Sequence, residues 1–174
     1  VPKEQSDTVT VREKIGHFLD NEVQRICDIY KKEGYSNKDI SKEIAENVDI
    51  ERILTRASRK FDGGYVIAGL IGHGDAFVMR DPAGIRPAYY YCDEEIAVVA
   101  SERPAIQTCI DVRYTEISEL KPGHALIIRK NGSIEEKQIK EAIERKSCSF
   151  ERIYFSRGTD RDILGKIISR LAIE

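Results

Sequence analysis

Four cysteines and three histidines are the side chains of this 174-residue chain most suited to act as nucleophiles, bases or metal ligands. His73 and His124 stand beside glycines, in turns between expected strands, where donation to a carbonyl is commoner than metal binding. The cysteines are widely spaced, without the C-x-x-C pair of zinc and redox sites. They are Cys27, Cys92, Cys109 and Cys148. We therefore expect free, buried thiols in a reducing compartment.

A turn bracketed by prolines spans residues 80–87 (RDPAGIRP). Pro82 favours an extended residue before it, and Gly84 supplies a position where φ can be positive. Arg86 lies where a turn between buried strands needs donors for unpaired carbonyls. We expect Arg86 to fill that structural role rather than to contact a substrate.

Residues 8–60 carry a helical pattern of apolar side chains. The first helix is expected to begin at Ser6 or Asp7 and to end at Gly34. Ser36 with Asp39 predicts the start of a second helix, and Asp49 that of a third. A short helical turn is expected over residues 104–108, and a helical tail from residue 160.

From Gly63 onward the pattern changes to strands rich in Val, Ile and Tyr. The Asn131-Gly132 pair predicts a hairpin with a type I′ turn. Helices followed by antiparallel strands predict an α+β fold. The expected strands cover residues 65–71, 76–80, 88–91, 96–100, 125–128 and 134–139.

Composition and charge set limits on the class of protein. Hydrophobic content of 41% and charged content of 33% are ordinary for a globular chain. A net charge of −2 gives no basic field for nucleic acid or anionic membrane. No membrane-span run or signal pattern is seen in the sequence. Because the chain begins Val1-Pro2, we expect a processed product or a segment of something longer.

Several motifs together resemble the glutaminase domain of amidophosphoribosyltransferases. They are residues 63–87, the Ala-Ser-Glu of 100–102, the LKPGHA of 120–125 and the CSFERIYFSR of 148–157. The resemblance is close over about residues 61–160 and looser at Ser6-Asp7. It implies an N-terminal nucleophile hydrolase type αββα sandwich, incomplete at its N-terminal end. It also implies domains at 1–158 (partial glutaminase) and 159–174 (start of the junction with the phosphoribosyltransferase).

The family's catalytic nucleophile has no counterpart in these residues. The resemblance implies an N-terminal cysteine whose thiolate attacks the glutamine amide, with its own α-amine moving the proton. Position 1 is Val1, and the internal cysteines have no free amine, so no catalytic residue is assigned. The Asn131-Gly132 pair has the composition of the family's oxyanion hole but the wrong place in the order. The family's arginine for the glutamine carboxylate also lies upstream of the matching region.

Ser6-Asp7 resembles the family's Ser-Asp, whose aspartate holds the α-amino group of glutamine. A carboxylate at a helix N-terminus suits an ammonium ligand, but it also suits a plain helix cap. We expect Asp7 to bind substrate, although Thr8-Val9 departs from the family's usual next residues.

Cys148 stands where one subset of the family has the first ligand of a [4Fe–4S] cluster. No cysteine follows it, so the other three thiolates would have to come from outside these residues, and a free thiol is the alternative. We expect no cofactor in this chain itself. The resemblance implies Mg²⁺ for the whole enzyme and, in that subset, the cluster.

The resemblance implies part of a cytoplasmic enzyme that makes phosphoribosylamine, glutamate and diphosphate from glutamine and phosphoribosylpyrophosphate (PRPP), in the first step of purine synthesis. Its implied partners are glutamine and the rest of a homo-oligomeric enzyme, with neither nucleic acid nor membrane. By itself the chain is expected to be inactive. Two alternatives remain: a non-catalytic glutaminase-like binding or regulatory module, and the glutaminase half of another amidotransferase.

Overall fold

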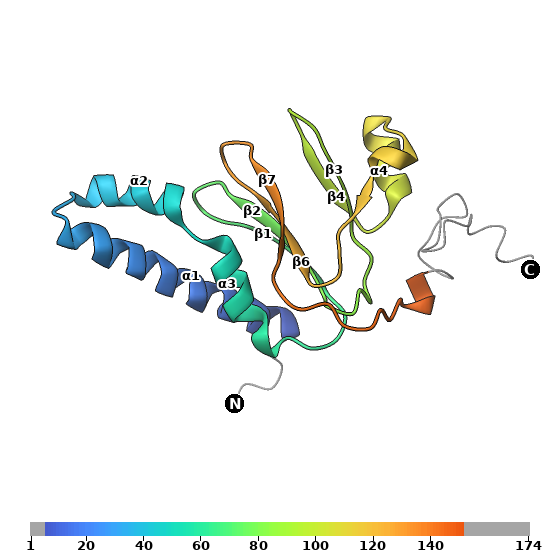
Figure 1. The fold of residues 1–174 in the computed structure, drawn as a ribbon, viewed down its shortest axis with the longest axis horizontal. Helices are drawn as coiled ribbons and strands as arrows, with labels where there is room; N and C mark the ends of the chain where they lie inside the picture. The colour runs from blue at the N-terminus through green and yellow to red at the C-terminus, as the bar shows by residue number, and fades with distance from the viewer. Residues whose placement is uncertain (1–5, 152–174) are drawn as a thin grey trace, which may run out of the picture. The chain divides into compact units, whose positions relative to one another are not determined.

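The computed structural model describes residues 6–151, which form helices followed by antiparallel strands (Figure 1). The chain divides into two compact units, whose described parts are residues 6–61 and 62–151. The α+β class expected from the sequence is confirmed. The expected boundary after residue 158 and the expected helical tail lie outside the described residues.

The first unit is helical, and its helices begin where the sequence predicts. The Ser36 hydroxyl accepts a hydrogen bond from the Asp39 N–H at 3.3 Å, and the Asp49 carboxylate accepts one from the Arg52 N–H at 2.9 Å. Gly34 has a φ of +85° just after the first helix ends. The elements are α1 (Asp7–Lys32), α2 (Asn37–Asn47), α3 (Ile50–Ala57) and the 3-10 helix η1 (Ser58–Lys60).

A buried carboxylate links α1 to α3. Glu22 of α1 is only 3% exposed. One of its oxygens accepts a hydrogen bond from Arg25 Nη2 at 2.5 Å, and Arg52 Nε of α3 lies 3.6 Å from the other. Because a buried carboxylate is costly without cationic partners, this pairing orients α3 against α1.

The second unit contains two antiparallel sheets. The four-stranded sheet has the order β1-β2-β6-β7, and the three-stranded sheet has the order β4-β3-β5. Helix α4 (Arg103–Ile110) lies against β3 and β4, and the 3-10 helix η2 (Tyr114–Glu116) precedes β5. The strands are β1 (Val66–Leu70), β2 (Ala76–Arg80), β3 (Tyr89–Cys92), β4 (Ala97–Ala100), β5 (Ser118–Glu119), β6 (His124–Ile128) and β7 (Ile134–Gln138).

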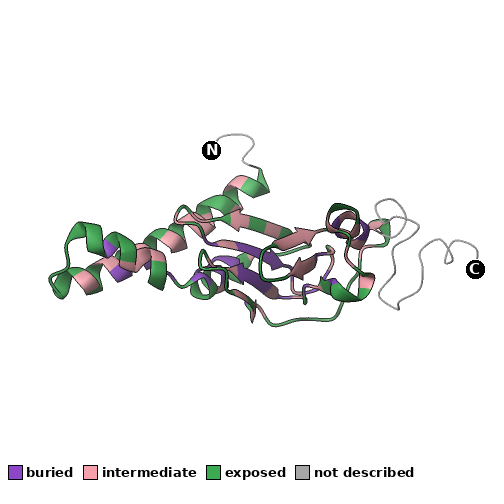
Figure 2. Ribbon diagram, turned by 90° about the horizontal axis from the view of Figure 1, so that it is seen from above, coloured by how far each residue is buried: buried purple, intermediate pink, exposed green. Residues whose placement is uncertain are grey.

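Apolar side chains from both sheets meet in one core, within the buried regions drawn purple in Figure 2. Val78 and Leu126 come from the four-stranded sheet, and Ala88 and Leu120 flank β3 and β5. A second cluster, with Tyr89, Ile106 and Ile117, lies under α4. All six predicted strands are present, whereas two-residue β5 is too short to show a period in the sequence.

The two hairpin loops of the four-stranded sheet share one geometry. In the β6–β7 loop, Gly132 N–H donates to the Arg129 carbonyl at 2.9 Å, and Arg129 N–H donates to the Ser133 carbonyl at 2.8 Å. Gly132 has a φ of +87°, but Asn131 does not have a positive φ. The loop is thus a type I turn followed by a bulged glycine, and the predicted type I′ turn is wrong. The Asn131 side chain instead accepts the Ser133 N–H at 2.9 Å.

Asp75 joins these two loops. It is 2% exposed and accepts hydrogen bonds from Lys130 N–H at 2.7 Å and Arg129 Nη1 at 2.9 Å, while His73 Nε2 lies 3.1 Å away. Burial by itself would raise the pKa of Asp75, but these three partners outweigh it and hold the pKa below its ordinary value. The ionised carboxylate therefore stabilises the end of the sheet.

The turn after β2 is organised by Asp81, which is fully buried. Its carboxylate accepts the backbone N–H groups of Ala83, Ile85 and Arg86 at 2.9–3.1 Å. Gly84, with a φ of +61°, donates its N–H to the Asp81 carbonyl at 3.2 Å. The predicted turn and the positive φ expected at Gly84 are confirmed, whereas the part played by the Asp81 carboxylate was not predicted.

Arg80, rather than Arg86, supplies the donors for the turn. Its buried guanidinium donates to the carbonyls of Arg86, Leu120 and Gly84 at 2.6–3.1 Å, and Nη1 also pairs with Glu119 of β5 at 2.8 Å. The prediction that Arg86 satisfies these carbonyls is wrong. The Arg86 side chain is 49% exposed, because the chain has left the core at that position. Arg80, the last residue of β2, faces the core instead.

We expect Asp81→Asn to lower the free energy of unfolding by about 1–3 kcal/mol, because one acceptor oxygen is replaced by a donor that faces backbone N–H groups. Urea unfolding followed by circular dichroism measures the change. Asp93→Asn is the matched control, since Asp93 accepts two N–H groups in an exposed turn. Equal losses in the two variants would contradict a central role for Asp81.

Stability should also depend on pH through Asp75. A carboxyl whose folded pKa is depressed stabilises the fold above its unfolded pKa, about 3.9, and loses that contribution as pH falls through the folded pKa. Asp75→Asn should therefore be less stable than wild type at pH 7, with the difference shrinking below about pH 4. Thermal melts from pH 7 to pH 2.5 measure it, with exposed Asp111→Asn as the control. A difference that does not change with pH would refute the assignment.

Candidate functional site

The segment after β7 runs along the turn at residues 80–87 and leads toward the end of the described region. We call residues 140–148 the connector. Its N–H groups donate to turn carbonyls: Ile143 to Pro82 at 3.0 Å and Lys146 to Ala83 at 2.9 Å. Backbone hydrogen bonds thus hold the connector against the turn.

Two ion pairs reinforce the connector and its continuation. Arg145 pairs with Glu119, the same carboxylate that receives Arg80. Burial alone would raise the pKa of Glu119, but the two arginines lower it below its ordinary value. Arg86, exposed on the turn, pairs with Glu151 at 2.7 Å. The carboxylates keep this segment in register with the turn.

Asp7 is the first residue of α1 and is exposed. Ser6 occupies the N-cap position, but its side chain makes no capping hydrogen bond, so a side-chain cap by Ser6 is not formed. The Asp7 carboxylate lies at the positive end of the α1 dipole, which favours a negative charge there, and a carboxylate can accept hydrogen bonds from an ammonium group. Its assignment as a glutamine-binding residue stays a prediction.

Cys148 is half-buried, and its N–H lies 3.4 Å from the Ile85 carbonyl. Among residues 6–151, no group of three or more His, Cys, Asp or Glu side chains is arranged to hold a metal ion. One thiolate does not hold an iron–sulfur cluster, so the further ligands would have to lie outside this region. The assignment of Cys148 as a cluster ligand stays a prediction, as do the implied Mg²⁺ and the absence of a catalytic residue.

The other cysteines differ partly from expectation. Cys109, in α4, is exposed, and Cys27 in α1 and Cys92 in β3 are half-buried. The four cysteines are free, as expected, but the expectation that they are buried is wrong for Cys109 and only partly met by the other three. Burial, with the nearby Asp93 charge, raises the pKa of Cys92, which keeps it a neutral thiol and a poor nucleophile at neutral pH.

The histidines also have structural partners. His124 Nδ1 lies 3.0 Å from the Pro122 carbonyl, as expected of a turn histidine. His73 faces the Asp75 carboxylate instead of a carbonyl. His17 Nε2 lies 3.0 Å from the Asn21 side chain, one helical turn away on α1.

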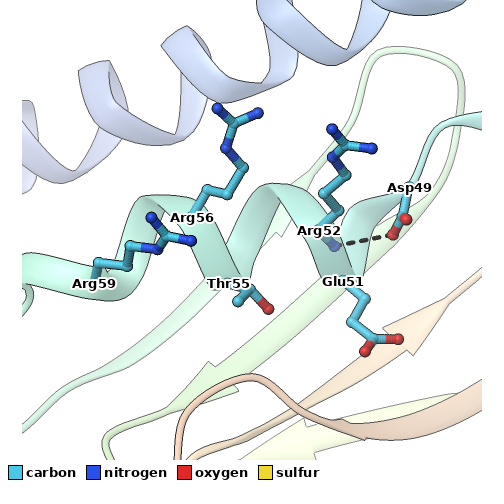
Figure 3. A pocket seen from close by; sticks show the side chains of 6 residues that line it. All are labelled: Asp49, Glu51, Arg52, Thr55, Arg56 and Arg59. Carbon is cyan, nitrogen blue, oxygen red and sulfur yellow. Dashed lines mark hydrogen bonds between the residues drawn. The ribbon is translucent and has the colours of Figure 1, made fainter.

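A groove of about 530 Å³ on α3 has no signal in the sequence analysis. In Figure 3 its three arginines point to one side of the helix and Glu51 to the other. Arg52 is paired with Glu22, and the Arg56 guanidinium lies 5.0 Å from the centre of the Phe18 ring. Because Arg52 and Arg56 already have partners and the lining also includes two acidic residues, we assign no anion site to the groove. Its lining consists of Asp49, Glu51, Arg52, Thr55, Arg56 and Arg59.

The described helices are too short or too polar to span a bilayer.

Sequence comparison finds similarity to amidophosphoribosyltransferases, although no family model matches the chain. The enzyme of Saccharomyces cerevisiae is 34% identical over 119 residues, which is 64% of this chain and 23% of the relative. That of Escherichia coli is 32% identical over 110 residues, or 60% of this chain and 21% of the relative. The chain thus spans about a quarter of the length of the curated relatives it matches.

Structural comparison gives the same enzyme. The glutamine PRPP amidotransferase of Bacillus subtilis, in complex with ADP and GMP, superposes with a TM-score of 0.58 and 23% identity. The match covers 83% of this chain and 32% of that chain. This likeness confirms the N-terminal nucleophile hydrolase type of fold expected from the sequence. The chain is therefore similar, in sequence over about two thirds of its length and in fold over more, to part of the amidophosphoribosyltransferases.

Proposed function

We propose that this chain is a portion of the glutaminase half of an amidophosphoribosyltransferase. The observation that carries the proposal is the 34% identity over 119 residues to an enzyme of that name. The two-sheet fold of the second unit supports it, because the same architecture is present in the solved amidotransferase. No observation specifically favours the alternative of a non-catalytic module.

In this proposal the nucleophile comes from an N-terminal cysteine outside the 174 residues. Its thiolate adds to the side-chain amide of glutamine, ammonia leaves, and water releases glutamate from the thioester. The ammonia then attacks the ribosyl carbon of PRPP and displaces diphosphate, which gives phosphoribosylamine, in the phosphoribosyltransferase domain of the same homo-oligomeric, cytoplasmic enzyme. The role of this chain is to hold glutamine and to support the site.

Asp7 is the residue of this chain that we propose to contact glutamine. Its carboxylate would accept a hydrogen bond from the substrate ammonium, and its exposure at the start of α1 leaves it accessible for that contact. A charge-assisted hydrogen bond of this kind contributes about 1.5–3 kcal/mol to binding.

The 174-residue chain incubated with glutamine should release no glutamate above an uncatalysed control, because its four thiols are all internal and lack an α-amine. A coupled glutamate dehydrogenase assay measures the release. Turnover by the purified chain would overturn our assignment of no catalytic residue within it.

The function itself is tested by exchange. The chain replaces the matching region of the Escherichia coli amidophosphoribosyltransferase, and the hybrid is assayed for glutamine-dependent and ammonia-dependent phosphoribosylamine formation. We expect both activities. A hybrid that folds and uses ammonia but not glutamine would contradict the proposed glutaminase role.

In the active hybrid, Asp7→Asn should raise KM for glutamine roughly 10- to 100-fold and leave the ammonia-dependent rate unchanged. Asp20→Asn, an exposed position further along α1, is the matched control. An unchanged KM together with a lower melting temperature would show that Asp7 only stabilises the helix.

A further inference from the structure

The loop between β6 and β7 places an asparagine and a glycine side by side at the surface. Asn131 and Gly132 are both exposed. A Cβ atom at Gly132 would meet nothing within 4 Å, so the space beside the Gly132 backbone nitrogen is open. Asparagine is chemically labile in such a place, because the backbone nitrogen of the next residue can attack its side-chain amide.

The Asn131 side chain already folds back toward that nitrogen. Its Oδ1 accepts the Ser133 N–H at 2.9 Å, which is the hydrogen bond of an Asx turn. The ring that this bond closes contains both Cγ of Asn131 and the nitrogen of Gly132, the two atoms that have to join. The bond also draws electron density toward Oδ1, which makes Cγ more electrophilic.

One hydrogen bond opposes the reaction. The Gly132 N–H donates to the Arg129 carbonyl at 2.9 Å, and a nitrogen engaged in this way is a poor nucleophile. The attack also requires a rotation of the Asn131 backbone away from its conformation in the turn. Exposed loops open at a small cost in free energy, so this loop slows the reaction without preventing it.

The other three asparagines lack this freedom. They lie in helices, whose backbone dihedrals do not allow a side chain to close a five-membered ring with the next nitrogen. Each is followed by a residue with a side chain, which crowds that nitrogen further. They are Asn21 in α1 and Asn37 and Asn47 in α2.

We propose that Asn131 is a site of spontaneous deamidation, and that its isoaspartate product loosens the hairpin. The Gly132 nitrogen adds to Cγ of Asn131 and loses its proton, and the side-chain amide group takes up a proton and leaves as ammonia. The product is a five-membered succinimide between the two residues. Water then opens the ring at one of its two carbonyls, which gives aspartate or isoaspartate. Overall the chain loses ammonia and gains water, and no atom is oxidised or reduced.

The two products differ in their effect on the hairpin. Aspartate keeps the length of the backbone, and its carboxylate can accept the Ser133 N–H as the amide does. Isoaspartate routes the main chain through the side-chain carbon, which adds one atom to a loop closed by bonds between Arg129, Gly132 and Ser133. Arg129 and Lys130 stand directly before the modified residue and bind the buried Asp75 carboxylate. Isoaspartate should therefore loosen the joint between the two hairpin loops.

The first test locates the reaction. The full chain is kept in neutral buffer for several weeks, digested with trypsin and mapped by mass spectrometry. The peptide of residues 131–137 should gain about 1 Da, at least roughly tenfold faster than the peptide that carries Asn21, an exposed asparagine in the middle of α1. In guanidinium chloride the rate at Asn131 should rise further, because the Gly132 N–H is released.

Three outcomes of this test would count against the proposal. No mass gain in the peptide of residues 131–137, or an equal gain in both peptides, would overturn the assignment of Asn131. A rate that guanidinium chloride does not raise would contradict the protective role of the bond between Gly132 and Arg129.

The second test follows the consequence. The deamidated fraction of the aged chain is isolated by ion exchange, and its isoaspartate is measured with an isoaspartyl methyltransferase. Hydrogen exchange of the Lys130 amide, which donates to Asp75, should be about tenfold faster in the isoaspartate form than in freshly prepared Asn131→Asp, which has the same charge. The Ile106 amide in α4 is the control and should not change. Equal exchange at Lys130 in the two samples would refute the loosening of the hairpin.

Discussion

The buried pair of neighbouring charges at the end of β2 is the interaction on which the second unit depends. Arg80 and Asp81 are 2% and 0% exposed, yet they do not pair with each other. The Arg80 guanidinium donates to three backbone carbonyls and to Glu119 of the other sheet. The Asp81 carboxylate accepts hydrogen bonds from the backbone N–H groups of the turn. Burying two charges is tolerable only because each is surrounded by groups of opposite polarity.

The consequence is that one short turn connects three parts of the unit. Through Arg80 it reaches the three-stranded sheet, and through the Asp81 carbonyl it accepts the Gly123 N–H just before β6. Its own carbonyls receive the connector. Loss of either charge would leave its own hydrogen-bond partners unpaired in the core, so both residues of this turn have a structural role.

Buried or half-buried carboxylates join several pairs of segments that are distant in sequence. Asp75 joins the two hairpin loops, Glu22 joins α1 to α3, and Glu119 receives arginines from β2 and the connector. Each accepts from at least one arginine, whose planar group supplies several donors at fixed angles. Apolar contacts are not directional, so they do not by themselves fix how two segments are oriented. These hydrogen-bonded ion pairs supply that orientation.

The sequence alone determined the order and type of the longer helices and strands, because the spacing of apolar residues and the capping residues Ser36 and Asp49 act locally. It also indicated the resemblance to amidophosphoribosyltransferases and the turn at Asp81. Only the tertiary structure decided that Arg80 rather than Arg86 serves that turn, and that Gly132 follows a type I turn. Those choices depend on which side chain faces the core and on how two strands twist, and both are set by contacts between residues far apart in the chain.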